Sequence, residues 1–130
     1  MASIGDRPAV LVVDDEIIIA QLVADMLGSE GYDVDIAPHG VAALESLAKR
    51  RYDLILSDLR MPQLDGIGLF RAVQERFPEL LRRFVFITGT SEHNDYQEFI
   101  EELSVPVLTK PFDMAELQRL AREVLSGPAR

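Results

Sequence analysis

The chain has 130 residues, 48% of them hydrophobic and 27% charged, which fits one compact domain over residues 1–130 with a core of about 8–125. Acidic residues outnumber basic ones 22 to 13, and the net charge of −9 disfavours unaided binding to nucleic acids or anionic membranes. The chain lacks cysteine, an apolar signal-peptide core and any apolar run of roughly 18 residues, so we expect a soluble, cytoplasmic protein without disulfides or thiolate metal sites.

The first half of the chain alternates short apolar segments with stretches of helical periodicity. In chain order it predicts a strand over Val10 to Val13, a helix ending near Gly31, a weaker strand over Asp33 to Ala37, a helix over Val41 to Lys49 and a strand over Leu54 to Leu56. The first helix is the clearest, because its apolar residues have the spacing of one buried stripe. They are Ile19, Leu22, Val23, Met26 and Leu27.

The second half continues the alternation. A helix from Gly66 must stop by Phe77, because Pro78 disfavours helical backbone in the residue before it. The remaining predicted elements are a strand over Phe84 to Ile87, a polar helix from about Asn94 to Leu103, a strand over Val105 to Leu108 and a last helix that starts after Asp113 as its N-cap.

Five strands alternating with five helices predict an α/β fold, a doubly wound parallel sheet with right-handed crossovers. The flavodoxin-like strand order 2-1-3-4-5 is the one we expect. In such sheets, ligands bind beyond the carboxyl ends of the strands, at the point between strands one and three where the winding reverses. Asp14 and Asp58 follow those two strands.

Five residues with reactive or metal-binding groups stand at the ends of predicted strands: Asp14, Asp15, Asp58, Thr88 and Lys110. Singly, each has an ordinary structural explanation as a helix cap, a turn residue or a solvated side chain. Together, three ionised carboxylates in one crevice repel one another, by about 4 kcal/mol per pair at ~4 Å and an effective dielectric near 20. Either the uptake of a proton by one carboxylate or a bound divalent cation relieves that repulsion. Mg²⁺ suits an all-oxygen site that phosphate oxygens complete.

Phosphoryl transfer gives each of these groups a task. A lysine offsets the charge of a phosphoryl group and a threonine hydroxyl hydrogen-bonds its oxygen, while Asp58 can act as the nucleophile that forms an acyl phosphate. Pro111 follows Lys110 directly, and a cis peptide bond at that place would hold the amine in a fixed turn.

These residues and their spacing resemble the receiver domain of two-component response regulators over nearly the whole chain. The motifs that carry the resemblance are VLVVDDE with Asp14 and Asp15, LILSDLRMPQLDG with Asp58, FVFITGT with Thr88, and PVLTKPF with Lys110. The resemblance implies a phosphoacceptor that catalyses only its own phosphorylation and dephosphorylation and is not a turnover enzyme.

The family pattern assigns a role to each position. Asp58 would accept a phosphoryl group from a phosphohistidine on a sensor histidine kinase or a histidine phosphotransfer protein. Mg²⁺ (or Mn²⁺) would be held by Asp15, Asp58 and the main-chain carbonyl of Arg60, with Asp14 acting through water. Thr88 would move toward the phosphoryl oxygens, Lys110 would pair with the modified aspartate, and the small Gly89 would leave the phosphoryl group room to enter.

Two positions need separate comment, because one departs from the family pattern and the other varies within the family. Family members commonly carry Tyr or Phe three residues before the lysine, as a switch that turns inward with the threonine, and here that position is Val107. We therefore expect phosphorylation to act on the face of the fourth helix, fifth strand and fifth helix through backbone and packing changes. Arg60 lies at a position that varies in the family, and we hypothesise that it tunes the lifetime of the phosphoryl group.

The first helix is predicted to keep an apolar outer side near the acidic site. Ile17, Ala20, Gln21 and Ala24 fall largely off its predicted buried stripe. The resemblance suggests that a kinase or phosphotransfer helix docks there, although scattered apolar surface residues are common and need no partner.

Two other functions remain open at this point. A degenerate receiver that only docks partners is favoured by Val107 and opposed by the retention of all five site residues. A magnesium-dependent phosphohydrolase would need a second carboxylate two residues after its nucleophile, where this chain has Arg60. We expect no output domain after Leu125, which leaves a stand-alone receiver, a phosphorelay shuttle or a piece of a longer regulator or hybrid kinase. A downstream target or a homodimer would use the fourth helix, fifth strand and fifth helix.

Overall fold

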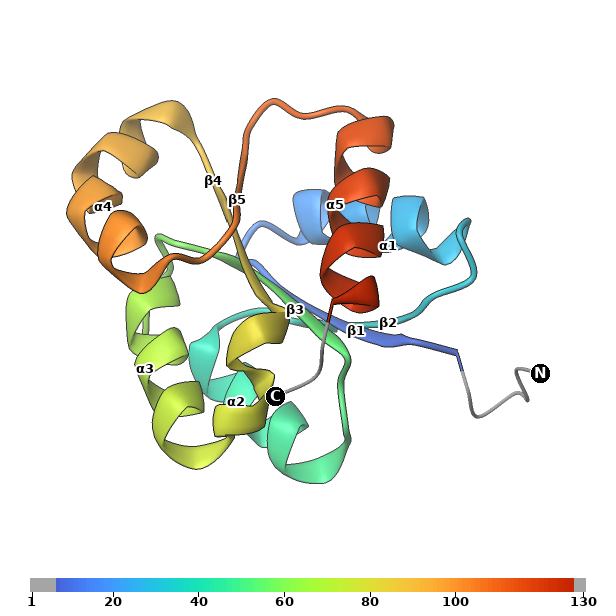
Figure 1. The fold of residues 1–130 in the computed structure, drawn as a ribbon, viewed down its shortest axis with the longest axis horizontal. Coiled ribbons are helices and arrows are strands. Elements are labelled where there is room, and N and C mark those ends of the chain that lie inside the picture. The colour runs from blue at the N-terminus through green and yellow to red at the C-terminus, as the bar shows by residue number, and fades with distance from the viewer. Residues whose placement is uncertain (1–6, 128–130) are drawn as a thin grey trace.

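A computed structural model of the chain describes residues 7–127, with the backbone alone for 90–93 (Figure 1). Strands and helices alternate along the whole of this range. In order they are β1 (Ala9–Val13), α1 (Ile17–Gly28), β2 (Asp33–Ala37), α2 (Gly40–Lys49), β3 (Leu54–Asp58), α3 (Gly66–Arg76), the 3-10 helix η2 (Pro78–Arg83), β4 (Phe84–Thr88), α4 (Thr90–Leu103), β5 (Val107–Thr109) and α5 (Met114–Ser126).

The strands form one parallel sheet in the order β2-β1-β3-β4-β5, so the predicted strand order is confirmed. Strand β1 pairs with β2 on one side and with β3 on the other, and the winding reverses between β1 and β3. The register places Val13 opposite Ser57, so the residues that follow them, Asp14 and Asp58, leave the sheet side by side.

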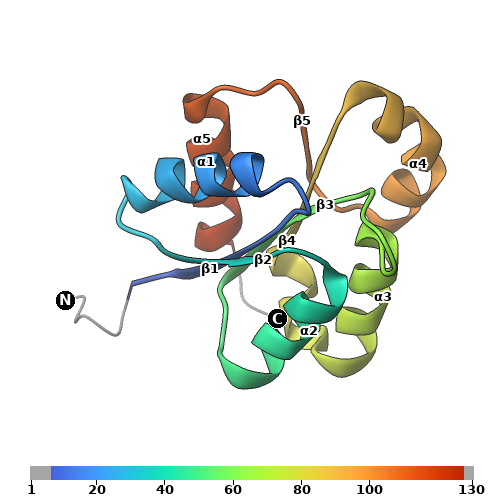
Figure 2. The same cartoon turned by 180° about the vertical axis from the view of Figure 1, so that it is seen from behind.

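Helices cover both faces of the sheet, and Figure 2 shows α1 and α5 on one side with α2 and α3 on the other. Alternate strand residues point to opposite faces, which separates the core into two clusters. Residues such as Val12, Leu56 and Ile87 pack against α1 and α5. On the other face Phe84 and Phe86 contact Phe70 of α3, with ring centroids 5.2 and 6.1 Å from that of Phe70.

The buried side of α1 differs from the predicted stripe. Its buried residues are Ala20, Val23 and Leu27, whereas Leu22 is 48% exposed and Ile19 is half-buried. The prediction that Ala20 lies on the outer side is therefore wrong. Ala20 belongs to the cluster on the α1 and α5 face of the sheet, and its neighbour Ile19 packs partly against the same cluster.

Helix starts follow their capping residues. Asp113 caps α5 as predicted, and its carboxylate accepts from the Glu116 amide while the Glu116 side chain accepts from the Asp113 amide. Asp65 caps α3 by accepting from the Gly68 amide at 2.8 Å. Pro78, predicted to end α3, also starts η2, a short 3-10 helix that the apolar periodicity does not indicate.

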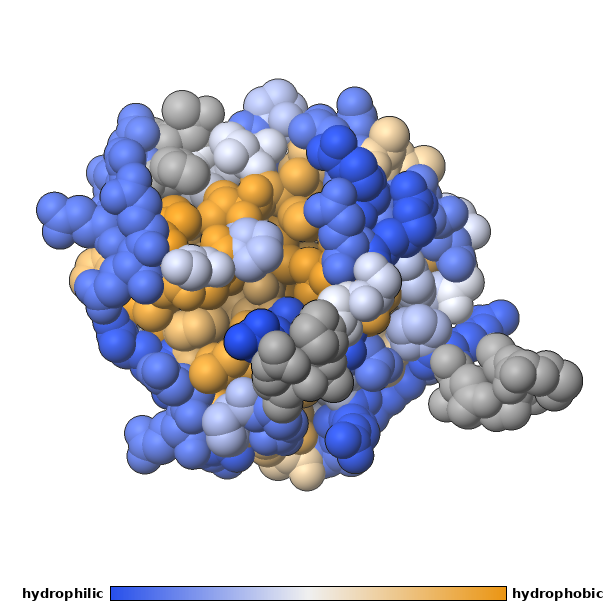
Figure 3. Space-filling model, viewed as in Figure 1, coloured by the Kyte–Doolittle hydropathy of each residue, from blue (hydrophilic) through white to orange (hydrophobic). Residues whose placement is uncertain are grey.

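Helix α4 and strand β5 start at other residues than predicted. Helix α4 begins at Thr90, four residues before the predicted start, and β5 runs from Val107 instead of Val105. Val105 is nevertheless buried, and the Pro106 carbonyl accepts from the Phe86 amide at 3.0 Å. In Figure 3 hydrophobic surface gathers between α4 and α5, where β5 forms the edge of the sheet.

Within residues 7–127, none of the helices has the length and the apolar character that crossing a membrane requires.

Gly66, at the start of α3, packs tightly against the backbone of Asp58 and Leu59. A Cβ at this position would lie 2.5 Å from the Asp58 carbonyl oxygen and 2.9 Å from the Leu59 Cα, and neither atom belongs to a side chain that can swing away. We expect Gly66→Ala to lower the free energy of unfolding by about 1–3 kcal/mol in a urea titration. Gly28→Ala is the control, because nothing lies within 4 Å of a Cβ there, and equal stability of the two variants would contradict the prediction.

Candidate functional site

The ends of four strands bring the predicted site residues together. Asp58 is the last residue of β3 and pairs with Ile87 of β4, so Thr88 lies one step beyond it on the neighbouring strand. The Lys110 amide donates to the Thr88 carbonyl at 2.7 Å, which continues the β4–β5 pairing to the lysine. Asp14, Asp58 and Thr88 are each less than 5% exposed.

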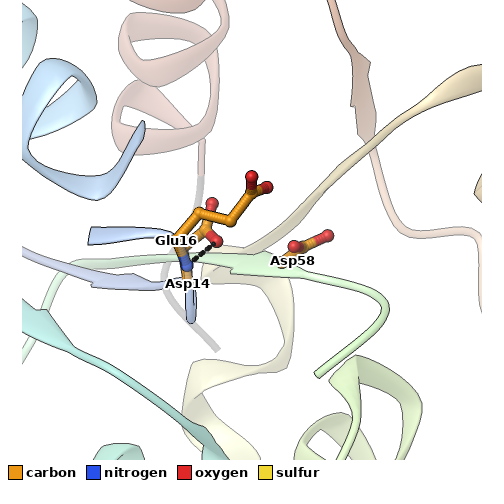
Figure 4. Close-up of side chains that lie close together, drawn as sticks. All are labelled: Asp14, Glu16 and Asp58. Atoms are coloured by element: carbon orange, nitrogen blue, oxygen red, sulfur yellow. Dashed lines mark hydrogen bonds between the residues drawn. The ribbon is translucent and has the colours of Figure 1, made fainter. Parts of the chain in front are cut away.

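Three carboxylates at this edge lie close enough to share a ligand. Asp14, Glu16 and Asp58 each offer a carboxylate oxygen, and these oxygens lie within 4.8 Å of one another. Figure 4 shows the three side chains gathered above the ends of β1 and β3, where the Glu16 amide donates to Asp14 Oδ1 at 2.9 Å. Carboxylate oxygens are hard ligands, so this group could hold a divalent metal ion.

Lys110 stands among the same three carboxylates. Its Nζ lies 3.6 Å from Glu16 Oε1 and 3.8 Å from both Asp14 Oδ2 and Asp58 Oδ2. The Lys110–Pro111 peptide bond is cis, as the sequence allowed. One ammonium therefore serves three acids, and the site as a whole keeps an excess of negative charge.

Burial has the largest effect on the pKa of the Asp14 carboxyl. It raises the pKa of the Asp14 carboxyl above its usual value, because the charged form loses solvation. The hydrogen bond from the Glu16 amide and the charge of Lys110 act in the opposite direction, while Glu16 and Asp15 raise the pKa further. A cation bound beside this carboxylate would favour its ionised form.

Asp15 does not belong to the close group of three acids, although the sequence pairs it with Asp14. Its side chain is exposed and lines an opening of about 400 Å³ together with Glu16, Asp58 and Arg60. Glu16 was missed as a site residue. The signal for it was available, because it directly follows the aspartate pair in the turn that leads from β1 to α1.

Arg60 extends from the same opening toward α4. Its guanidinium forms an ion pair with the Asp95 carboxylate and lies 5.9 Å from the centroid of the Tyr96 ring. The Tyr96 hydroxyl donates to Asp65 Oδ2 at 3.2 Å. Sequence reasoning missed Asp95 and Tyr96, because no local pattern pairs α4 with the loop that follows Asp58.

The residues predicted to form the switch lie on neighbouring strands. Thr88 is fully buried, and its hydroxyl contacts the carbonyl of Gly89 at 3.2 Å. Val107 starts β5 opposite Phe86 and is half-buried against the cluster on the α3 and α4 side of the sheet. Its small side chain leaves the outer surface of β5 without an aromatic ring.

The predicted docking residues of α1 fall into two groups. Ile17 and Gln21 are exposed and Ala24 is half-buried, whereas Ala20 is completely buried and has no surface to offer. Ile18, which is 79% exposed, and Leu22 were not predicted to lie outside. The apolar outer side of α1 therefore exists, but it is formed in part by other residues.

Comparison with known proteins agrees with this geometry. Residues 10–122 match the family model described as "Response regulator receiver domain". The chemotaxis protein CheY4 of Vibrio cholerae is 30% identical with a TM-score of 0.82, and the match covers 92% of this chain and 99% of CheY4. The receiver domain of NtrX from Brucella abortus is 29% identical with a TM-score of 0.84, again over 92% of this chain and 99% of the other.

Longer proteins contain a similar segment. The sensor histidine kinase RcsC of Salmonella typhi is 35% identical over 91% of this chain, which corresponds to 12% of RcsC. The chain spans less than half the length of the curated relatives compared with it. Its motifs, its strand order and these matches lead to one assignment: the chain belongs to the response regulator receiver domain family, the phosphoacceptor domains of two-component signal transduction, which have no turnover catalysis.

Proposed function

We propose that Asp58 is the phosphoacceptor and that it takes its phosphoryl group from a phosphohistidine of a sensor histidine kinase or a histidine phosphotransfer protein. A carboxylate oxygen of Asp58 forms the new bond to phosphorus as the bond from phosphorus to the imidazole nitrogen breaks, and the imidazole leaves with the electron pair. The observation that supports this assignment is the position of Asp58, buried at a strand end with Lys110 Nζ 3.8 Å from its carboxylate.

The other groups of the site fit supporting roles in this transfer. Lys110 offsets negative charge as the phosphoryl group arrives, and the Thr88 hydroxyl, one strand away, supplies a hydrogen bond to a phosphoryl oxygen. Gly89 adds no side chain beyond its Cα at the entrance. These roles explain why a cation and a hydroxyl border a cluster of acids.

Mg²⁺, or Mn²⁺, is the metal that the donor set fits, since the three clustered side chains, Asp14, Glu16 and Asp58, each offer a carboxylate oxygen. Asp15, Asp58 and the main-chain carbonyl of Arg60 would hold it, with Asp14 acting through water, and Glu16 adds a further carboxylate at the same edge. When bound, the metal supplies positive charge that neutralises the acids and the incoming phosphoryl oxygens.

Partner binding is proposed for two surfaces. A kinase or phosphotransfer helix docks on the outer side of α1 through Ile17, Gln21 and Ala24, with Ala20 excluded because it is buried. The face formed by α4, β5 and α5 passes the signal to a downstream protein or to a second copy of the chain, and the hydrophobic surface between α4 and α5 supports this choice (Figure 3).

A docking module that does not depend on phosphorylation is the alternative function. Val107 favours it, because a receiver without an aromatic ring on β5 lacks one common means of reporting the state of the site. The cost of keeping like charges close together opposes it.

Phosphorylation of the purified chain tests the proposed role of Asp58. Incubation with acetyl phosphate and magnesium should add the mass of one phosphoryl group, detected by intact mass spectrometry. Asp58→Asn should abolish the gain, because an amide is a poor nucleophile. Asp25→Asn, an acid on the outside of α1, is the matched control and should react like the wild type. An unchanged mass in the wild type would support the docking module, and continued release of phosphate from monoesters would support a phosphohydrolase.

Magnesium alone should raise the melting temperature. A ligand that binds only the folded chain stabilises it by RT ln(1 + [L]/Kd), which is about 2.7 kcal/mol when the concentration is 100 times Kd. The measurement is thermal unfolding followed by circular dichroism with increasing magnesium. Asp58→Asn should reduce the shift and Asp25→Asn should preserve it. The metal proposal fails if the wild type melts at the same temperature with and without magnesium.

Arg60→Ala should shorten the lifetime of the phosphoryl group. The arginine borders the opening through which water reaches Asp58, and its removal exposes the acyl phosphate. We expect dephosphorylation to accelerate about two- to fivefold, equivalent to ~0.5–1 kcal/mol of barrier. Loss of the phosphoryl mass after removal of acetyl phosphate measures the rate, with Arg71→Ala on α3 as a control that removes the same charge away from the site. A rate identical to that of the wild type would disprove this role.

A further inference from the structure

Among the side chains that the structure describes, two polar contacts join the loop after Asp58 to helix α4. Arg60, at the start of the loop, forms its ion pair with Asp95, and Asp65, at the end of the loop, accepts a hydrogen bond from the Tyr96 hydroxyl at 3.2 Å. The two partners on α4 are adjacent residues. The loop is thus connected at both ends to the same turn of α4, and it follows directly from the proposed phosphoacceptor.

The described part of α4 has few further contacts with the protein, and one of them is the Arg71 guanidinium of α3, which lies 5.8 Å from the centroid of the Phe99 ring. Among residues 94–103 only Ile100 is buried, and Tyr96 and Leu103 are half-buried. The remaining side chains in that range are exposed, and three of them are glutamates. A helix with so little buried apolar surface is held weakly, so its position depends on polar contacts more than that of α3, which buries five residues.

Arg60 lies at the same opening as the proposed phosphoacceptor. Its side chain is 55% exposed and lines the same opening as Asp58. A phosphoryl group adds about 1.5–2 negative charges and three strong acceptor oxygens. A guanidinium pairs with such a group through two parallel hydrogen bonds, whereas an exposed pair with one carboxylate is weak.

We propose that Asp95 is a positioning residue that holds Arg60 against α4 before phosphorylation, and that Arg60 leaves Asp95 for the phosphoryl oxygens once Asp58 is modified. The exchange breaks the ion pair to α4 and withdraws the guanidinium from the face of the Tyr96 ring. Helix α4 then loses one of its contacts to the loop, while the Tyr96–Asp65 hydrogen bond remains, and the helix becomes looser. This inference rests on the proposed function of Asp58 and supplies a link from that residue to α4 that uses no ring on β5.

Competition between Asp95 and the phosphoryl group has a reciprocal consequence. If phosphorylation weakens the Arg60–Asp95 pair, then loss of Asp95 must strengthen binding at the phosphorylation site by the same factor. That factor can be measured with beryllofluoride, which together with magnesium mimics a phosphoryl group on an aspartate and binds reversibly.

The test compares the dissociation constant for beryllofluoride, at fixed magnesium, in the wild type, Asp95→Asn and Glu98→Gln. Asp95→Asn should bind about two- to fivefold more tightly, because the Asp95 carboxylate no longer competes with the bound group for Arg60. Glu98→Gln removes the same charge from an exposed place on the same helix and should bind like the wild type. Equal affinities for all three proteins would overturn the proposal, as would tighter binding by both variants, which would indicate a general effect of charge.

Hydrogen exchange and a second substitution separate this exchange of partners from a merely structural role of Asp95. Amides 94–103 should exchange faster in unliganded Asp95→Asn than in the unliganded wild type, and beryllofluoride should produce the same change in the wild type. In an Arg60→Ala background, Asp95→Asn should no longer alter the affinity. An effect of Asp95→Asn that persists without Arg60 would contradict the proposal. Failure of the wild type to bind beryllofluoride would instead remove the proposed function and this inference together.

Discussion

The structure depends on holding like charges together at one edge of a sheet. Asp14, Glu16 and Asp58 come from two adjacent strand ends, and the lysine that offsets their charge comes from the far end of the chain. The parallel sheet reverses its winding between β1 and β3, so these two strands lie beside each other. Strands β4 and β5 follow on the β3 side and bring Thr88 and Lys110 to the same edge. The hydrophobic clusters on both faces supply the stability that this electrostatic repulsion consumes.

Much of this arrangement could be predicted from the sequence, because each buried strand is an apolar run and the polar residue that ends the run marks the edge of the sheet. That logic identifies Asp58, Thr88 and Lys110. It does not reach Glu16, because the direction of a side chain in a turn has no periodicity to reveal it. The prediction for Ala20 was wrong for a related reason. Nearly every residue in the first half of α1 is apolar, so the sequence pattern does not distinguish the buried side of the helix from the exposed side.

The contacts of α4 could not be predicted, since they join residues far apart in the sequence through charge and not through a hydrophobic pattern. Its composition is polar, and most of the side chains of residues 94–103 are exposed. What composition cannot indicate is that Arg60 and Asp65 lie opposite Asp95 and Tyr96. A short loop with two polar side chains thereby connects a helix with little buried surface to the residues next to the site.

The short edge strand β5 affects how the molecule can associate. Unpaired amides and carbonyls at the margin of a sheet invite a foreign strand to add itself, which leads toward aggregation. Here the margin is three residues long and lies between Pro106 and Pro111, neither of which has an amide hydrogen to donate. A border this short offers few backbone groups to an added strand, so association at β5 would depend mainly on side-chain contacts, which need not extend the sheet into a fibril.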